Sequence, residues 1–145
     1  MRYWLPVLVW MLIIFSASSD TMSFQRSSRI LAPIIRWLFP HLPEETVSGI
    51  VFIIRKCAHL TEYAVLALLL WRAFRKPVRH DPRPWRWADA RLAILCVGLY
   101  AASDEFHQLF VPHREGKVGD VFIDTSGGVA ALLLLWAIGR LSRQW

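Results

Sequence analysis

Residues 55–63 read RKCAHLTEY and run directly into the apolar segment AVLALLLW at 64–71. At about 100° per residue on a helix, the five most polar side chains of this stretch fall within an arc of roughly 120°: Arg55, Lys56, His59, Glu62 and Tyr63. The rest of the helix surface carries mostly small and apolar side chains. The stretch therefore predicts a helix with one face suited to lipid and one face suited to the polar interior of a protein.

Two later segments repeat this combination of an apolar run and a polar end. Residues 100–108 read YAASDEFHQ. The i, i+3 and i+4 spacings place four of them on one polar stripe of a helix: Tyr100, Asp104, His107 and Gln108. Glu105 lies at the edge of this stripe. Residues 118–139 begin with two carboxylates one turn apart, and the same stripe continues through small residues: Asp120, Asp124, Gly127 and Ala131. Small residues at these positions allow a neighbouring helix to approach closely.

The composition points to a membrane protein. The chain has 145 residues, of which 55% are hydrophobic and 19% charged. This balance excludes a disordered chain and argues against an ordinary soluble domain, in which about a quarter of residues are charged. Four segments approach the roughly 17–25 residues that a helical span needs: 3–17, 55–71, 91–111 and 118–139. We therefore predict an all-α, polytopic membrane bundle of four transmembrane helices that forms a single domain over residues 1–145.

The first segment has an alternative interpretation. Arg2, the apolar run and Ser16-Ala17-Ser18 together resemble a secretory signal peptide with a small-residue cleavage site. Removal of this helix would break the charge pattern of the four-span topology, so we expect the segment to be retained as a span.

Basic residues set the expected orientation through the positive-inside rule. With both termini in the cytoplasm, the inner side holds ten basic and two acidic residues, and the outer side seven basic and nine acidic residues. Most inner basic residues lie in one linker, which we expect to contact anionic inner-leaflet lipids: Arg72, Arg75, Lys76, Arg79, Arg83, Arg86 and Arg91. Trp85 and Trp87 are expected to anchor this linker at the interface. No nucleic-acid-binding motif accompanies the charge, so no nucleic-acid partner is expected.

Apolar residues between the first two spans recur at helical spacing. Ile30, Leu31, Ile34, Ile35, Leu38 and Phe39 follow this spacing beside two arginines. They predict a short interfacial helix between spans one and two, ended by Pro40. Membrane lipids are therefore expected partners along this segment.

Charged groups within a span are costly and need partners or a wet cavity. In the predicted topology, the polar ends of the second, third and fourth spans all lie in the outer half of the membrane. The turn between the last two spans adds one more cation. We therefore predict a polar pocket that opens outward, lined by Arg55, Lys56, His59, Glu62, Tyr63, Asp104, Glu105, His107, Gln108, Arg114, Asp120 and Asp124.

The polar motifs follow one another in a defined order along most of the chain. In sequence they are Phe15-Ser16, Ser18-Ser19, Arg55-Lys56, His59, Glu62-Tyr63, Ser103-Asp104-Glu105, His107-Gln108, Phe110, Pro112, Arg114, Asp120, Asp124 and Gly127-Gly128. In this order and spacing they resemble the VanZ-like family of small bacterial integral membrane proteins, related to the teicoplanin-resistance protein VanZ. The family pattern often has an Asn before the two glycines, where this chain has Thr125 and Ser126.

The resemblance implies a location and a biological context. It implies a multi-pass protein of the bacterial cytoplasmic membrane that acts at the cell envelope and is linked to glycopeptide tolerance. It implies no particular reaction.

Three hypotheses account for the polar residues. In the first, Arg55, Lys56 and Arg114 hold the phosphate of an anionic lipid or lipid-linked wall precursor. The ligand-binding set then also includes Tyr63, Glu105, Gln108, Asp120 and Asp124.

In the second hypothesis, the protein is a membrane-embedded hydrolase or transferase acting on an envelope lipid, with four catalytic residues: His59, Glu62, Asp104 and His107.

In the third hypothesis the charged groups only pair with one another. Arg55 or Lys56 would pair with Glu62, and Arg114 with Asp120 or Asp124. Buried ion pairs are poor sources of net stability, and apolar replacements often serve as well. This argument weakens the structural hypothesis without removing it.

No organic cofactor is evident, and a divalent metal remains a candidate. His59-x-x-Glu62 and Asp104-x-x-His107 place ligand types one helical turn apart, a spacing that metal sites in helix bundles also use. The cysteines, Cys57 and Cys96, are predicted to be buried thiols that lie too far apart for a disulfide.

Overall fold

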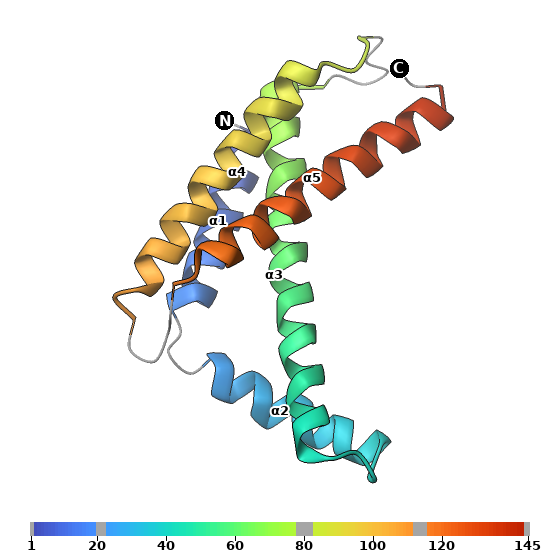
Figure 1. Ribbon diagram of the computed structural model, residues 1–145. Coiled ribbons are helices and arrows are strands. Elements are labelled where there is room, and N and C mark those ends of the chain that lie inside the picture. The colour runs from blue at the N-terminus through green and yellow to red at the C-terminus, as the bar shows by residue number, and fades with distance from the viewer. Residues whose placement is uncertain (1, 20–22, 78–82, 112–115, 144–145) are drawn as a thin grey trace.

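The computed structural model describes residues 2–19, 23–77, 83–111 and 116–143. These residues form helices and no strand (Figure 1): α1 (Trp4–Ser19), α2 (Ser23–Leu38), α3 (Glu44–Arg75), α4 (Trp87–Gln108) and α5 (Val118–Leu141). The all-α class is therefore confirmed for the described part of the chain. The four predicted spans lie largely within α1, α3, α4 and α5, and the predicted interfacial segment lies within α2 and the residue that follows it.

Helix α3 is longer than the sequence analysis predicted. It has 32 residues, about 48 Å of helix, and begins at Glu44 rather than near Arg55. Glu44 and Glu45 occupy its first turn, where carboxylates favour the positive end of the helix dipole. The prediction was too short because hydropathy measures how much of a helix can face lipid, whereas backbone hydrogen bonds continue through polar residues.

Helix α3 is the centre of the molecule and contacts all four other helices. In Figure 1, α1 and α4 run opposite to α3 and α5, and α5 crosses α3 obliquely. Helix α2 packs against the first part of α3, where Ile35 contacts Val47 and Val51 in a small separate core. An ion pair between Arg36 and Glu44 closes the turn between these two helices.

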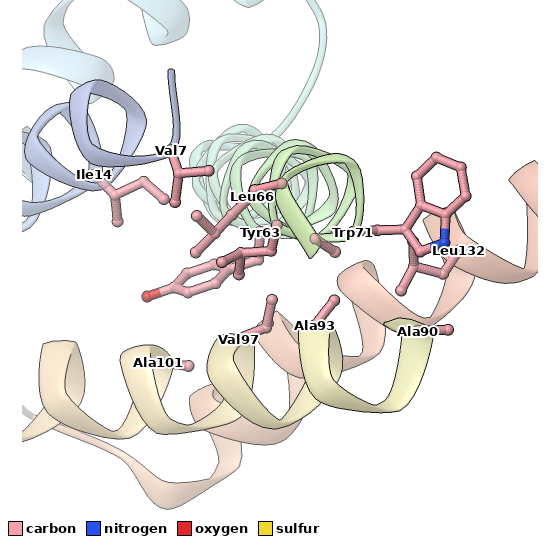
Figure 2. Packing of buried hydrophobic residues seen from close by; sticks show 13 residues of the cluster. Val7, Ile14, Tyr63, Leu66, Trp71, Ala90, Ala93, Val97, Ala101 and Leu132 are labelled. Atoms are coloured by element: carbon pink, nitrogen blue, oxygen red, sulfur yellow. The ribbon is translucent and has the colours of Figure 1, made fainter. Parts of the chain in front are cut away.

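The main core forms where α1, α3, α4 and α5 meet (Figure 2). Its members are buried apolar side chains from all four helices, among them Val7, Leu66, Val97 and Leu132. Helix α1 is fixed to this core by two partly buried hydrogen bonds. The indole N–H of Trp10 donates to the Glu62 carbonyl at 2.9 Å, and the Tyr100 hydroxyl donates to the Met11 carbonyl at 2.6 Å.

Helices α3 and α5 approach each other closely at Gly127. A Cβ added at this position would overlap the backbone carbonyl oxygen of Leu60. One turn of sequence earlier, Asp124 is buried against the same part of the bundle. The predicted role of small residues on this stripe of α5 is therefore confirmed at Gly127.

The opposite end of the bundle holds the basic linker, and one of its arginines differs from the prediction. Arg75 is buried, and its guanidinium donates to the carbonyls of Arg83 at 2.5 Å and Pro84 at 3.0 Å. The expectation that Arg75 contacts lipid is therefore wrong, because backbone carbonyls of the linker accept the N–H groups of its guanidinium. Trp85 likewise stacks on Trp71, with ring centroids 5.3 Å apart, so it is part of a packed contact.

The prediction of two buried thiols is also wrong. Cys57 is exposed and Cys96 half-buried, and neither forms a disulfide. Cys57 belongs to the small and apolar part of α3, and that part of the surface faces away from the bundle. The predicted absence of a Cys57–Cys96 disulfide agrees with the structure.

By length and composition, the described residues include one helix that is long and apolar enough to cross a membrane, α5, with α1 as a shorter apolar helix. Helices α3 and α4 contain more charge within their apolar stretches. The four-span arrangement is therefore a prediction that helix composition alone does not establish.

Candidate functional site

Polar side chains from four helices come together at one region of the bundle. They lie at the end of α1, in the middle of α3, at the end of α4 and at the start of α5. Each helix presents its polar stripe there because the rest of its surface is apolar and packs into the core or faces outward. We call these residues the polar cluster: Ser18, Lys56, Tyr63, Asp104, Glu105, Gln108, Asp120 and Asp124.

Asp104 is the most connected carboxylate of the polar cluster. Its Oδ2 atom accepts hydrogen bonds from the Ser18 hydroxyl at 2.6 Å, the Gln108 amide at 3.1 Å and the Tyr63 hydroxyl at 3.4 Å. All four side chains are buried. Because the donors come from α1, α3 and α4, this one oxygen joins three helices.

Glu105 forms the second connection of the cluster and is also buried. Its Oε2 accepts the backbone N–H of Lys117 at 2.8 Å, and its Oε1 lies 3.4 Å from the Gln108 amide nitrogen. Lys117 directly precedes α5, so Glu105 fixes the start of α5 to the end of α4. Gly116 packs against the Glu105 carbonyl oxygen, where a Cβ would overlap it.

Lys56 and Asp120 form the accessible part of the polar cluster. The Lys56 ammonium lies 2.5 Å from Asp120 Oδ1, and the two side chains keep 28% and 24% of their surface exposed. This ion pair links the middle of α3 to the first turn of α5. It is open to a molecule arriving from outside the bundle, unlike the Asp104 network.

His59 and Glu62 lie beside this accessible edge on α3. Their closest side-chain atoms, His59 Nδ1 and Glu62 Oε2, are 3.9 Å apart, and both side chains are half-buried. The distance allows an ion pair when the imidazole is protonated and is too long for a hydrogen bond. Both residues have further contacts, so their orientation is set by more than this pair.

Among the residues that the structure describes, three buried polar side-chain atoms at this end of the bundle have no hydrogen-bond partner. They are Asp104 Oδ1, Asp124 Oδ2 and His107 Nδ1. Buried polar atoms in native proteins are normally satisfied, so unpaired ones often mark a functional site or a missing ligand. The His107 ring packs instead against Phe15, with centroids 4.7 Å apart.

Comparison with protein families identifies this combination of residues. The VanZ/LLP1 family model matches the chain over residues 3–139. The chain belongs to the VanZ/LLP1 family. No match was found among curated proteins or among solved structures. VanZ-like proteins are membrane proteins, and the family is linked to glycopeptide resistance.

The structure of this VanZ-like chain brings most of the predicted site residues together. Tyr63, Asp104, Glu105 and Gln108 share one hydrogen-bond network, and Lys56 pairs with Asp120. The structural hypothesis had offered Glu62 as a partner of Lys56. Asp120 takes that place, because α5 starts directly beside this turn of α3.

Of the other predicted residues, Asp124 lies inside the cluster, and the rest lie at its edge, pack elsewhere or fall outside the described residues. Arg55, His59 and Glu62 are half-buried on α3, and Asp124 is buried within electrostatic reach of Asp104, Glu105 and Asp120. His107 contacts Phe15 rather than the carboxylates. Arg114 falls outside the described residues.

Ser18 is the site residue that the sequence analysis missed. It belongs to the Ser18-Ser19 motif that carried the family resemblance, yet it had been assigned no role. Its hydroxyl makes the shortest hydrogen bond to Asp104, and its side chain is 2% exposed. The signal that the sequence offered was a serine near the end of an apolar helix, within a motif that carried the family resemblance.

Among the described residues, no group of three or more His, Cys, Asp and Glu side chains is arranged to hold a metal ion. The two residue pairs predicted as metal ligands lie in different surroundings. The His107 ring packs against Phe15, whereas His59 lies beside Glu62. Away from the polar cluster, an open cavity of about 400 Å³ lies between α2 and the first part of α3. Its lining includes Arg29, Arg36, Glu44 and Val51.

Proposed function

We propose that this VanZ-like protein crosses the bacterial cytoplasmic membrane four times, through α1, α3, α4 and α5, with both termini in the cytoplasm. The outward surfaces of the bundle support this, because large apolar side chains are exposed along α1, α4 and α5, such as Leu12, Leu99 and Leu134. In a membrane these surfaces face lipid. The partly buried hydrogen bonds that join α1 to α3 and α4 support its retention as a span.

Cysteine labelling at the two ends of α5 tests this topology. In a Cys57→Ser, Cys96→Ser background, Gly119→Cys is expected to react with a membrane-impermeant maleimide added to intact spheroplasts. Ser142→Cys is expected to react only after permeabilisation. Both positions are exposed, and a Cβ at Gly119 meets nothing within 4 Å. Labelling of both residues from the same side would contradict the proposal.

We further propose that the polar cluster opens to the outer leaflet and binds the phosphate of an anionic lipid or lipid-linked wall precursor. The observation that carries this proposal is the Lys56–Asp120 ion pair, whose side chains stay 28% and 24% exposed where four helices bring their polar residues together. Arg55, which directly precedes Lys56 on α3, supplies a further cation for a phosphate, and Arg114, which lies outside the described residues, stays a candidate from the sequence. Exposed apolar side chains beside it, such as Phe52 and Phe122, suit the hydrocarbon tail. Retention of such a ligand would connect the protein to tolerance of glycopeptides such as teicoplanin.

Native mass spectrometry of the detergent-extracted protein tests this function. We expect the wild type to retain a phospholipid or prenyl phosphate, and Lys56→Gln to lower the retained fraction about tenfold. This factor corresponds to the loss of one charge-assisted hydrogen bond of about 1.4 kcal/mol. Expression of the wild type, but not of Lys56→Gln, is expected to raise teicoplanin tolerance in a susceptible bacterium.

Lys76→Asn is the matched control for this experiment. Lys76 lies at the opposite end of α3, and asparagine tolerates its left-handed backbone conformation, with φ of 47°. The control removes the same charge and should leave lipid retention unchanged. Equal retention by Lys56→Gln and the wild type would contradict phosphate binding at Lys56.

A second candidate function is catalysis on the bound lipid. It is favoured by the position of His59 and Glu62 beside the accessible ion pair, where an acid–base pair can reach a bound headgroup. The same spectra distinguish the two functions. A cleaved or transferred lipid on the wild type, replaced by intact lipid on His59→Ala, would identify an enzyme.

A further inference from the structure

Charges in the polar cluster are sorted by depth. Three carboxylates are buried, those of Asp104, Glu105 and Asp124, with 3%, 6% and 2% of each residue exposed. The ion pair of Lys56 with Asp120 lies nearer the surface. A ligand that enters past this pair therefore meets a cation at the edge and an excess of carboxylates further in.

Asp124 is one of two carboxylates in this inner group with an oxygen that has no hydrogen-bond partner among the described residues. Its Oδ2 is fully buried and unpaired, although Lys56, Glu105 and Asp120 all lie within electrostatic reach of it. Asp104 also has one unpaired oxygen, Oδ1. Both atoms can only accept hydrogen bonds when the carboxylates are ionised, so each needs a donor.

The Lys56–Asp120 pair limits which phosphate ligands fit well. A phosphate that takes Lys56 leaves Asp120 without its cation, one turn from Asp124 on the same helix. An unpaired buried or half-buried charge is strongly unfavourable. A ligand that carries a phosphate and an ammonium group avoids this cost, because the phosphate pairs with Lys56 while the ammonium pairs with Asp120 and Asp124.

We propose that the polar cluster binds a phosphoester whose headgroup also carries a primary ammonium group. This inference rests on the proposed phosphate-binding function, keeps its phosphate, and narrows the ligand from an anionic headgroup to one that also carries a positive charge. A primary ammonium has three N–H donors for the carboxylate oxygens of Asp120 and Asp124. A quaternary ammonium has the same charge but no N–H donor, and a glycerol headgroup has hydroxyls but no positive charge.

Competitive lipid binding tests the proposal. Delipidated full-length protein is mixed with equal amounts of phosphatidylethanolamine, phosphatidylcholine and phosphatidylglycerol with identical acyl chains, and bound lipids are counted by native mass spectrometry. We expect phosphatidylethanolamine to be retained about tenfold more than either competitor. Asp124→Asn and Asp120→Asn are expected to bring this ratio close to one, while Lys56→Gln lowers retention of all three lipids.

The controls separate this inference from the function on which it rests. Asp89→Asn removes a carboxylate that pairs with Arg86 in the first turn of α4, away from the cluster, and should keep the preference. The Asp120 side chain is partly exposed, so Asp120→Asn is expected to fold and still tests the ammonium site if Asp124→Asn fails to fold. Lysine-dependent binding with no preference for phosphatidylethanolamine would overturn the ammonium site alone. Retention of none of the three lipids by the wild type would overturn the ammonium site, and the absence of any retained phospholipid or prenyl phosphate in the detergent extract would overturn the phosphate-binding function as well.

Discussion

Gly127→Ala is expected to separate α3 from α5 and to destabilise the protein strongly. The added Cβ would overlap the backbone carbonyl oxygen of Leu60, and it would also lie 3.0 Å from the Leu60 side chain. A flexible side chain can move away, but a helix carbonyl moves only with its helix. Overpacking of this kind costs about 1–3 kcal/mol, and a rigid backbone contact places the expected loss at the upper end. An SDS-unfolding titration of the detergent-solubilised protein measures the change in free energy of unfolding.

Gly119→Ala is the matched control, because it makes the same substitution in the first turn of the same helix. A Cβ at Gly119 meets nothing within 4 Å. Alanine has a higher helix propensity than glycine, so this variant should be neutral or more stable by up to about 1 kcal/mol. If Gly127→Ala were as stable as Gly119→Ala, the close contact between α3 and α5 would not exist.

Asp104→Ala is expected to cost roughly 3 kcal/mol or more of unfolding free energy. The substitution removes the acceptor of three donors, the Ser18 and Tyr63 hydroxyls and the Gln108 amide. Each buried donor left without a partner costs about 1–3 kcal/mol, although the three losses are not strictly additive. Because the donors come from three helices, we expect loss of packing of α1 as well as a lower unfolding temperature.

Ser103→Ala is the control for this variant. Ser103 directly precedes Asp104 but is exposed, and its hydroxyl donates to the Tyr100 carbonyl of its own helix. Its removal should change stability by less than about 0.5 kcal/mol. Equal stability of Asp104→Ala and the wild type would show that the Asp104 network does not hold α1, α3 and α4 together.

Asp104→Ala and Lys56→Gln together divide the polar residues by role. A large loss of stability in Asp104→Ala would assign the inner network to structure. Loss of lipid binding without loss of folding in Lys56→Gln would assign the accessible ion pair to ligand binding. The structural and binding hypotheses would then both hold, for different residues. Glu105 belongs with the inner group, since it fixes the backbone at Lys117.

The amino-acid sequence by itself determined the helical class, the approximate position of each long helix and the polar face of α3. These follow from local properties, because apolar content and the 3.6-residue period are properties of a single segment. The polar arc at Arg55–Tyr63 and the stripe through Asp104 and Gln108 were predicted in this way. The close approach at Gly127 was also predicted, because only a small residue permits it.

Only the tertiary structure decided which polar groups become partners. Ser18 and Asp104 are 86 positions apart in the chain, yet they share the shortest hydrogen bond of the inner network. Lys56 pairs with Asp120 because α5 begins beside that turn of α3, and Arg75 is buried because the folded linker presents its carbonyls there. A helix pattern predicts which side of a helix is polar. The crossing angles and relative heights of packed helices then decide which atoms meet, and these depend on the whole core at once.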